Sequence, residues 1–225
     1  MESYLSFSKK SLYILGVVIL GVSLMLMALV MTEQAGLIDE WAAQFAAGSG
    51  KGLHQFFSVL TPFGSGKVLG PVALFFVFLI GVVKKDWIQA LMMFIGVLMG
   101  YGFNIVLKSM VARDRPVINE GVEGFSFPSG HAMVSLICAV LAFYFLSRKA
   151  RSKVVVAISS VVGFTLVFLI GISRVFEGAH YFSDVLAGFT FGFVFAGVWI
   201  VLYEWLEKRT NLRLEAEEKT TRSMF

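Results

Sequence analysis

The sequence has little charge for its length. Asp, Glu, Lys and Arg make up only 15% of the 225 residues, whereas hydrophobic residues make up 57%. Soluble domains carry about 25% charged residues, so an ordinary soluble fold is excluded and lipid must solvate much of the surface. The apolar runs leave no stretch for a separate soluble core, and we expect one membrane domain covering residues 1–225.

Cysteine is almost absent. The one cysteine, Cys138, lies in an apolar run, which excludes an intrachain disulfide and a cysteine metal framework. The net charge of +4 does not indicate a nucleic-acid partner, because the basic residues form short clusters beside apolar runs and make no single patch. This pattern is typical of membrane topology signals.

Six apolar segments are long enough to cross a bilayer, although the fourth is short. We therefore expect an all-α, polytopic membrane protein with six transmembrane helices and both termini on one side. The stretch 32–66 is mixed in character and predicts short amphipathic helices in the first outer loop. The six segments are approximately residues 11–31, 67–83, 87–107, 132–147, 154–172 and 183–203.

The basic residues predict the orientation. With a cytoplasmic N-terminus, thirteen of the nineteen Lys and Arg residues fall on the cytoplasmic side, as the positive-inside rule requires. Both termini are therefore expected in the cytoplasm. The six remaining cations fall on the outer side: Lys51, Lys67, Lys108, Arg113, Arg115 and Arg174.

Three polar clusters lie at the outer ends of the predicted helices. Ionisable residues at such positions are either interface anchors or parts of a functional site. In the first cluster Lys108 and Arg115 are seven residues apart, which places them on one helical face if the helix persists. Pro116 disfavours helical geometry at Arg115 and suggests that the helix ends there. Taken alone, the two cations are also compatible with snorkelling anchors.

The second cluster, Pro128-Ser129-Gly130-His131, stands where the fourth apolar run begins. Ser129 is placed to cap the helix, and the free amides that follow would form an anion site. Gly130 lets a ligand oxygen approach the backbone, and His131 can donate a proton to that ligand. A capped helix start with an incidental histidine remains the alternative.

The third cluster contains Arg174, His180 and Asp184. His180 and Asp184 are four residues apart where the sixth helix begins, so both side chains share one face. The carboxylate can fix the imidazole tautomer and leave the other ring nitrogen free to act as a nucleophile. Arg174 offers a planar fork for phosphate oxygens. All three clusters fall on the same predicted side, and together they indicate one anion site.

Two further patterns carry weaker predictions. Gly188, Gly192 and Ala196 mark one face of the sixth helix and predict close helix packing, either within the bundle or between protomers. The charged residues that flank the clusters are expected to be solvated loop charges. They are Arg113, Asp114, Glu120, Glu123 and Glu177.

The three clusters resemble, in order and without a departure, the signature motifs of the type 2 phosphatidic acid phosphatase superfamily. The six-helix layout is also similar to the bacterial membrane branch of that family, which implies a bacterial cell membrane location. The resemblance implies a phosphohistidine mechanism with no metal or other cofactor and an active site on the outer face. The catalytic residues would be His180, His131 and Asp184, and the phosphate-binding residues Lys108, Arg115, Ser129, Gly130 and Arg174.

The implied substrate is a membrane lipid phosphate, first phosphatidylglycerophosphate and second undecaprenyl pyrophosphate. The motif residues hold phosphate and do not separate these lipids. An anion transporter is the alternative from a different class, although the spans have no charged residue at their centres. A metal site made of His131, His180 and Asp184 is the other alternative.

Overall fold

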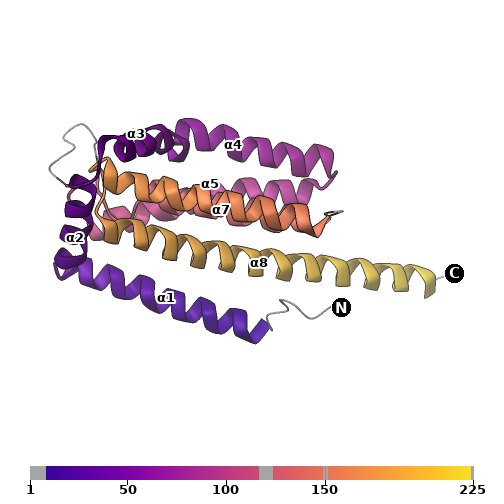
Figure 1. Cartoon of the computed structure of the whole chain (residues 1–225). Helices are drawn as coiled ribbons and strands as arrows, with labels where there is room; N and C mark the ends of the chain where they lie inside the picture. The colour runs from indigo at the N-terminus through magenta and orange to yellow at the C-terminus, as the bar shows by residue number, and fades with distance from the viewer. Residues whose placement is uncertain (1–8, 117–123, 149, 151, 224–225) are drawn as a thin grey trace.

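A computed structural model describes residues 9–116, 124–148, 150 and 152–223. Six helices that are long and apolar enough to span a bilayer form a bundle, and a short helix lies across one end of it (Figure 1). The described residues contain no strand. The elements are α1 (Lys9–Met31), α2 (Gly36–Ala47), α3 (Lys51–Leu60), the 3-10 helix η1 (Thr61–Gly64), α4 (Gly66–Phe78), the π-helical turn η2 (Leu79–Val83), α5 (Trp87–Val111), α6 (Gly130–Ser147), α7 (Lys153–Phe176) and α8 (Phe182–Ser223).

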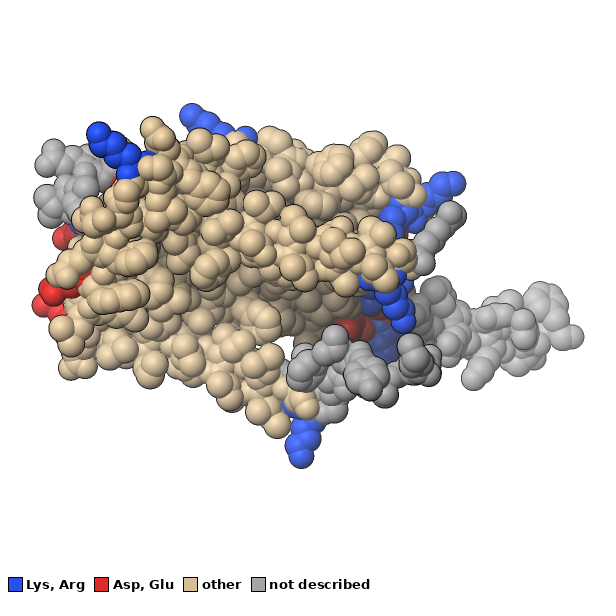
Figure 2. Space-filling view, viewed as in Figure 1, with Lys and Arg blue, Asp and Glu red and all other residues tan. Residues whose placement is uncertain are grey.

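Six helical stretches are long and apolar enough to span a bilayer, which confirms the prediction of a six-span membrane protein. Figure 2 shows a flank of uncharged residues with charged side chains toward its ends. Figure 1 places both termini at the same end of the bundle. α8 continues as a helix well past its apolar part, to Ser223.

The predicted end of the third span near Arg115 is wrong. α5 ends at Val111, and Ala112 adopts a left-handed conformation with φ of 49° that stops the helix. Arg115 therefore does not share a helical face with Lys108 and reaches its position along a non-helical segment. The early stop lets residues 112–116 turn back across the end of the bundle.

The first loop forms helices α2 and α3, as the amphipathic pattern predicts. α2 lies across the end of the bundle that is opposite the termini, between α1 and α3 (Figure 1). Leu37 and Trp41 of α2 are exposed, whereas Asp39 and Ala42 are buried. A charged residue is thus on the buried side of α2.

α6 is the central helix of the bundle. Its buried residues include Met133, Ile137 and Leu141, each 0% exposed, and it packs against α5, α7 and α8. Two glycines of α8, Gly188 and Gly192, face α6. A Cβ on Gly188 would lie 2.7 Å from the Ser129 carbonyl oxygen, and one on Gly192 would lie 2.9 Å from the Met133 carbonyl oxygen. The small residues of α8 therefore provide close packing within the bundle.

Adding one methyl group at Gly188 is expected to destabilise the protein. In Gly188→Ala the new Cβ meets backbone that cannot rotate away, and such overpacking costs about 1–3 kcal/mol. Gly197→Ala, on the same helix, is the matched control because a Cβ there has no atom within 4 Å. Thermal unfolding of the purified proteins in detergent should show a lower melting temperature only for Gly188→Ala. Equal melting temperatures would contradict the close packing of α8 against α6 at Gly188.

Candidate active site

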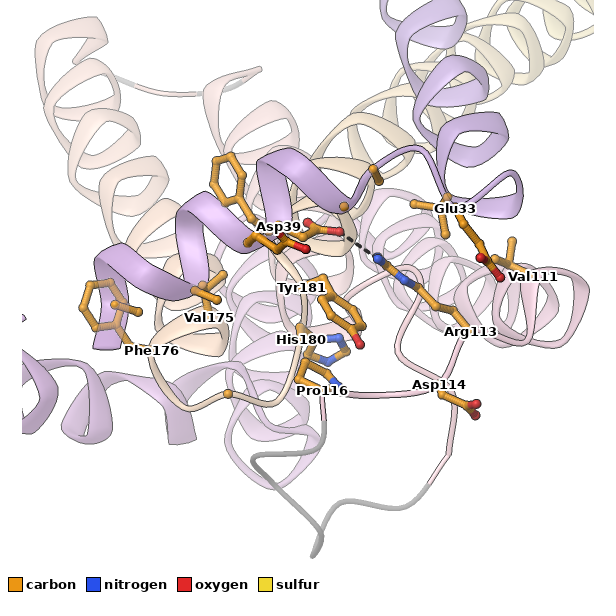
Figure 3. Close-up of a pocket in the computed structure, with 18 of the residues that line it drawn as sticks. Glu33, Asp39, Val111, Arg113, Asp114, Pro116, Val175, Phe176, His180 and Tyr181 are labelled. Atoms are coloured by element: carbon orange, nitrogen blue, oxygen red, sulfur yellow. Dashed lines mark hydrogen bonds and ion pairs between the residues drawn. The ribbon is translucent and has the colours of Figure 1, made fainter. Parts of the chain in front are cut away.

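The three polar clusters come together at the end of the bundle that lies opposite the termini. Lys108, Arg115, Arg174 and His180 are all within electrostatic range of His131. A cavity of about 690 Å³ opens beside them and is lined by segments from α1, α2, residues 111–116 and residues 175–182. Figure 3 shows His180 and Tyr181 in this cavity beneath α2.

Lys108 lies in the last turn of α5 and fastens the loop that precedes α6. Its Nζ donates to the carbonyl oxygens of Phe125 at 2.5 Å and Ser126 at 3.2 Å. Asn104, one turn earlier on α5, donates through Nδ2 to the Pro128 carbonyl oxygen at 3.3 Å. α5 thus positions both a cation and the loop that leads to Ser129.

Arg115 brings a guanidinium directly to His180. Its NH1 donates to the Ala179 carbonyl oxygen at 2.7 Å and lies 3.2 Å from His180 Nε2. Its Nε donates to the Gly124 carbonyl oxygen at 2.9 Å. Burial lowers the pKa of Arg115 from its usual value, and Asp184 partly opposes that effect. Arg115 places a guanidinium next to Nε2, and arginine carries a positive charge in proteins.

Ser129 occupies the N-cap position of α6, as the sequence predicts. Its Oγ, however, makes no capping bond, is buried, and has no hydrogen-bond partner. The N–H groups that open α6 at Gly130, His131 and Ala132 have no partner one turn back, because a helix cannot supply one. The serine oxygen and these amides together form a pocket of polar groups suited to an anion.

His180 and Asp184 lie where α7 gives way to α8. His180 is 4% exposed and Asp184 is 0% exposed. His180 Nδ1 is 3.5 Å from Asp184 Oδ2, which is too long for a strong hydrogen bond, although such contacts are often long before a substrate binds. The arrangement turns Nδ1 toward the carboxylate and Nε2 toward Arg115.

Arg174, in the last turns of α7, is held by a residue from the first loop. Its NH1 donates to Thr61 Oγ1 at 2.5 Å, and Thr61 begins η1. The side chain is 9% exposed, and its Nε has no hydrogen-bond partner. A buried guanidinium with a free N–H is a donor that an anionic ligand can use.

Unpaired polar atoms concentrate at this site. Among the described residues, five buried side-chain N or O atoms have no hydrogen-bond partner, and three of them are Ser129 Oγ, Arg174 Nε and His180 Nδ1. Leaving such groups unpaired costs about 1–3 kcal/mol each. His180 Nδ1 faces Asp184, whereas Ser129 Oγ and Arg174 Nε, with Lys108 and Arg115 nearby, would gain most from a bound anion of the size and charge of a phosphate.

Arg113 contradicts the prediction of a solvated loop charge. Its side chain is only 18% exposed, and it bridges two carboxylates. NH1 donates to Asp184 Oδ1 and NH2 to Asp39 Oδ2, each at 2.7 Å. Although burial alone would lower it, the pKa of Arg113 is raised by Asp184 and Asp39.

Asp39 on α2 is the second functional candidate that the sequence analysis missed. Figure 3 shows it pointing from α2 toward Arg113. It also accepts from the backbone N–H and the hydroxyl of Ser183, both at 2.8 Å. The only signal in the sequence was an acidic residue among apolar neighbours in a loop, which amphipathic helices commonly contain.

The other flanking charges do not join this network. Asp114 is exposed and points away from the Asp39–Arg113 pair (Figure 3), and Glu177 acts on Arg174 electrostatically. Glu120 and Glu123 lie outside the described residues. Within the part of the chain that the structure describes, no three His, Cys, Asp or Glu side chains are grouped so that they could hold a metal ion.

Comparison with known proteins places these residues in a family context. The family model of the PAP2 superfamily matches residues 87–208, which contain all three clusters. Phosphatidylglycerophosphatase B of Bacillus subtilis is 32% identical over 155 residues, covering 62% of this chain and 70% of that protein. Lipid A 1-phosphatase of Porphyromonas gingivalis is 36% identical over 95 residues, covering 41% of this chain and 19% of that protein.

A solved structure shares the fold. The crystal structure of a transmembrane PAP2 type phosphatidylglycerolphosphate phosphatase from Bacillus subtilis superimposes with a TM-score of 0.75 at 26% identity. The match covers 86% of this chain and 96% of the solved one. It therefore includes helices outside residues 87–208.

Burial of His180 predicts a stability loss in acid. Burial lowers its pKa to about 4 from 6.5, although Asp184 opposes the shift, so the folded protein favours the neutral imidazole. The resulting stability is fully present above about pH 6.5 and is lost as the pH falls toward 4. Melting temperatures measured from pH 7 to 4 should therefore fall more steeply for the wild type than for His180→Gln. Parallel curves for the two proteins would refute the shift.

Proposed function

Because the chain belongs to the PAP2 superfamily, we propose that it hydrolyses phosphatidylglycerophosphate to phosphatidylglycerol and phosphate through a phosphohistidine intermediate. The broader activity, that of a membrane lipid phosphatase, agrees with the family, the relatives and the six-span fold. The choice of lipid and the roles of the residues are the proposal.

In the first step His180 Nε2 attacks phosphorus. The bond from phosphorus to the lipid oxygen breaks, and His131 donates a proton to that oxygen, so the lipid leaves as an alcohol. Asp184 holds Nδ1–H and stabilises the positive imidazole ring that forms. The orientation of Nε2 toward Arg115 supports this assignment, since a phosphate drawn to Arg115 would lie next to the nucleophile.

In the second step water attacks the phosphohistidine. His131, now neutral, accepts a proton from that water, the bond between nitrogen and phosphorus breaks, and inorganic phosphate leaves. His180 and His131 thereby return to their starting states. This division of roles is the one that the family resemblance implies. It is supported by the separate origins of the two residues, since His131 opens α6 and His180 lies in the turn before α8.

Fixed positive groups would stabilise the charge on the phosphate oxygens. Lys108, Arg115 and Arg174 supply three cations, and the first amides of α6 add oriented dipoles. Phosphoryl transfer depends mainly on positioning and charge stabilisation, which this set provides. The buried, unpaired Ser129 Oγ and Arg174 Nε are the observation that carries the proposal, since a phosphate would satisfy both.

The orientation in the membrane is also proposed. The site lies at the end of the bundle opposite both termini, and the positive-inside bias assigns the termini to the cytoplasm. The active site would then face outward, at the depth of the lipid head groups of the outer leaflet. The lipid tails would remain in the bilayer while the head group reaches Lys108, Arg115 and Arg174.

Undecaprenyl pyrophosphate is the other substrate to test, because the groups that bind phosphate would accept its terminal phosphate equally well. Phosphatidylglycerophosphate ranks first because the Bacillus subtilis relative and the solved structure carry that activity in their names.

We expect purified protein in detergent to release phosphate faster from phosphatidylglycerophosphate than from phosphatidic acid or undecaprenyl pyrophosphate. His180→Ala should lower kcat by about 10³-fold or more, since it removes the nucleophile. Phosphate release by a colorimetric assay measures both effects.

His54→Ala is the matched control, because His54 Nε2 hydrogen-bonds to the Ala46 carbonyl oxygen and its ring packs against Phe176, and neither partner belongs to the proposed phosphate site. It should retain activity. A His180→Ala protein as active as the wild type would overturn the mechanism, and a different lipid ranking would replace the substrate.

Activity should persist in a metal chelator. The charge stabilisation proposed here comes from Lys108, Arg115 and Arg174, so excess EDTA should change the initial rate less than twofold. Phosphate release measured before and after dialysis against EDTA tests this expectation. A loss that Mg²⁺ or Zn²⁺ restores would instead favour a metal-dependent reaction.

A further inference from the structure

Asp184 has hydrogen-bond partners in addition to its contact with His180. Its Oδ1 accepts from Arg113 at 2.7 Å, and its Oδ2 accepts from the Tyr181 backbone N–H at 2.9 Å. The guanidinium of Arg113 stacks on the Tyr181 ring, 3.8 Å from its centroid. Both carboxylate oxygens are thus fixed, and Oδ2 is the one left facing His180.

This arrangement raises a problem of charge. A carboxylate with 0% exposure needs a cation to offset its loss of hydration, and Arg113 supplies one. The same cation, however, cancels the negative charge with which Asp184 would stabilise a positive His180 ring. A pair of Asp184 and Arg113 alone would present no net charge to the nucleophile.

Asp39 resolves this problem. It binds the other nitrogen of the Arg113 fork at 2.7 Å and is itself 4% exposed in its side chain. Two carboxylates and one guanidinium leave one net negative charge on the network. Asp39 also fixes the start of α8 by accepting from the N–H and the hydroxyl of Ser183.

We propose that Asp39 and Arg113 are positioning residues, and that helix α2 completes the catalytic centre by returning to Asp184 the negative charge that Arg113 would otherwise cancel. Asp39 lies before the family-matched segment, residues 87–208, so the first outer loop contributes to the chemistry. The inference rests on the proposed role of His180 and extends it to residues that do not touch the phosphate.

The test compares Asp39→Asn with the wild type on whichever lipid phosphate the wild type hydrolyses. Asparagine keeps the size of the side chain and removes its charge. We expect kcat to fall about 10- to 100-fold, the range seen for outer-shell partners in metal sites. KM should change less than about threefold, because Lys108, Arg115 and Arg174 still bind the phosphate. Asp39→Glu, which restores the charge, should recover part of kcat.

Glu40→Gln is the matched control, since it removes the same charge from the next residue of α2, which is exposed. It should leave kcat within about twofold of the wild type. A double-mutant cycle of Asp39→Asn with Arg113→Lys supplies the second measurement. Because Asp39 acts through Arg113, the two effects on kcat should be strongly non-additive. Melting temperatures of every variant identify any that fail to fold.

Several outcomes would overturn the inference. They are an Asp39→Asn protein with wild-type kcat, a loss confined to KM, equal losses in Asp39→Asn and Glu40→Gln, or additive effects in the cycle. Each leaves the proposed function intact, provided that the wild type is active and His180→Ala is not. If His180→Ala is as active as the wild type, the proposed function fails first and by itself.

Discussion

The buried carboxylate of Asp184 is the constraint around which the active-site end of this protein, opposite the termini, is built. A carboxylate with no exposed surface must be paired and hydrogen-bonded, and the network that does this draws on three separate parts of the chain. Arg113, from the segment after α5, and Tyr181, from the turn before α8, donate to Asp184 directly, and Asp39 on α2 binds Arg113. The need to satisfy one charge therefore draws helices from both halves of the sequence together.

The bundle beneath supplies the rigidity that such a network requires. α8 can present Asp184 beside Ser129 only because Gly188 and Gly192 let α6 approach at backbone distance. The Ser129 N–H donates to the Asp184 carbonyl oxygen at 3.0 Å across this seam. Lipid does not drive helices together as water does, so close van der Waals contact of this kind has to hold the seam. The close packing of α6 against α8 thus sets the positions of Ser129 and Asp184 in the active site.

Arg113 and Arg115 show why a sequence can reveal a site and still misassign its parts. Both are arginines on one short segment, and helical spacing related Arg115 to Lys108, whereas Arg113 had no such relation. In the structure α5 stops at Val111, so helical spacing has no meaning beyond it. The backbone turn at Ala112 decides that Arg115 faces His180 and that Arg113 faces Asp184 and Asp39. No local pattern encodes that turn.

The amino-acid sequence alone predicts the membrane class, the six spans, the amphipathic first loop and the three clusters, because hydrophobic length and residue spacing are local properties of the chain. It also predicts that His180 lies near Asp184, from helical spacing. The structure brings Nδ1 to 3.5 Å from Oδ2, although His180 lies in the turn before α8, which begins only at Phe182. Only the tertiary structure decided that Asp39 joins the site and where Arg174 binds Thr61. Asp39 and Arg113 are separated by 74 positions in the sequence, and Thr61 and Arg174 by 113 positions. The packing of α2 and η1 over the end of the bundle brings them into contact, and no periodic pattern in the sequence predicts that packing.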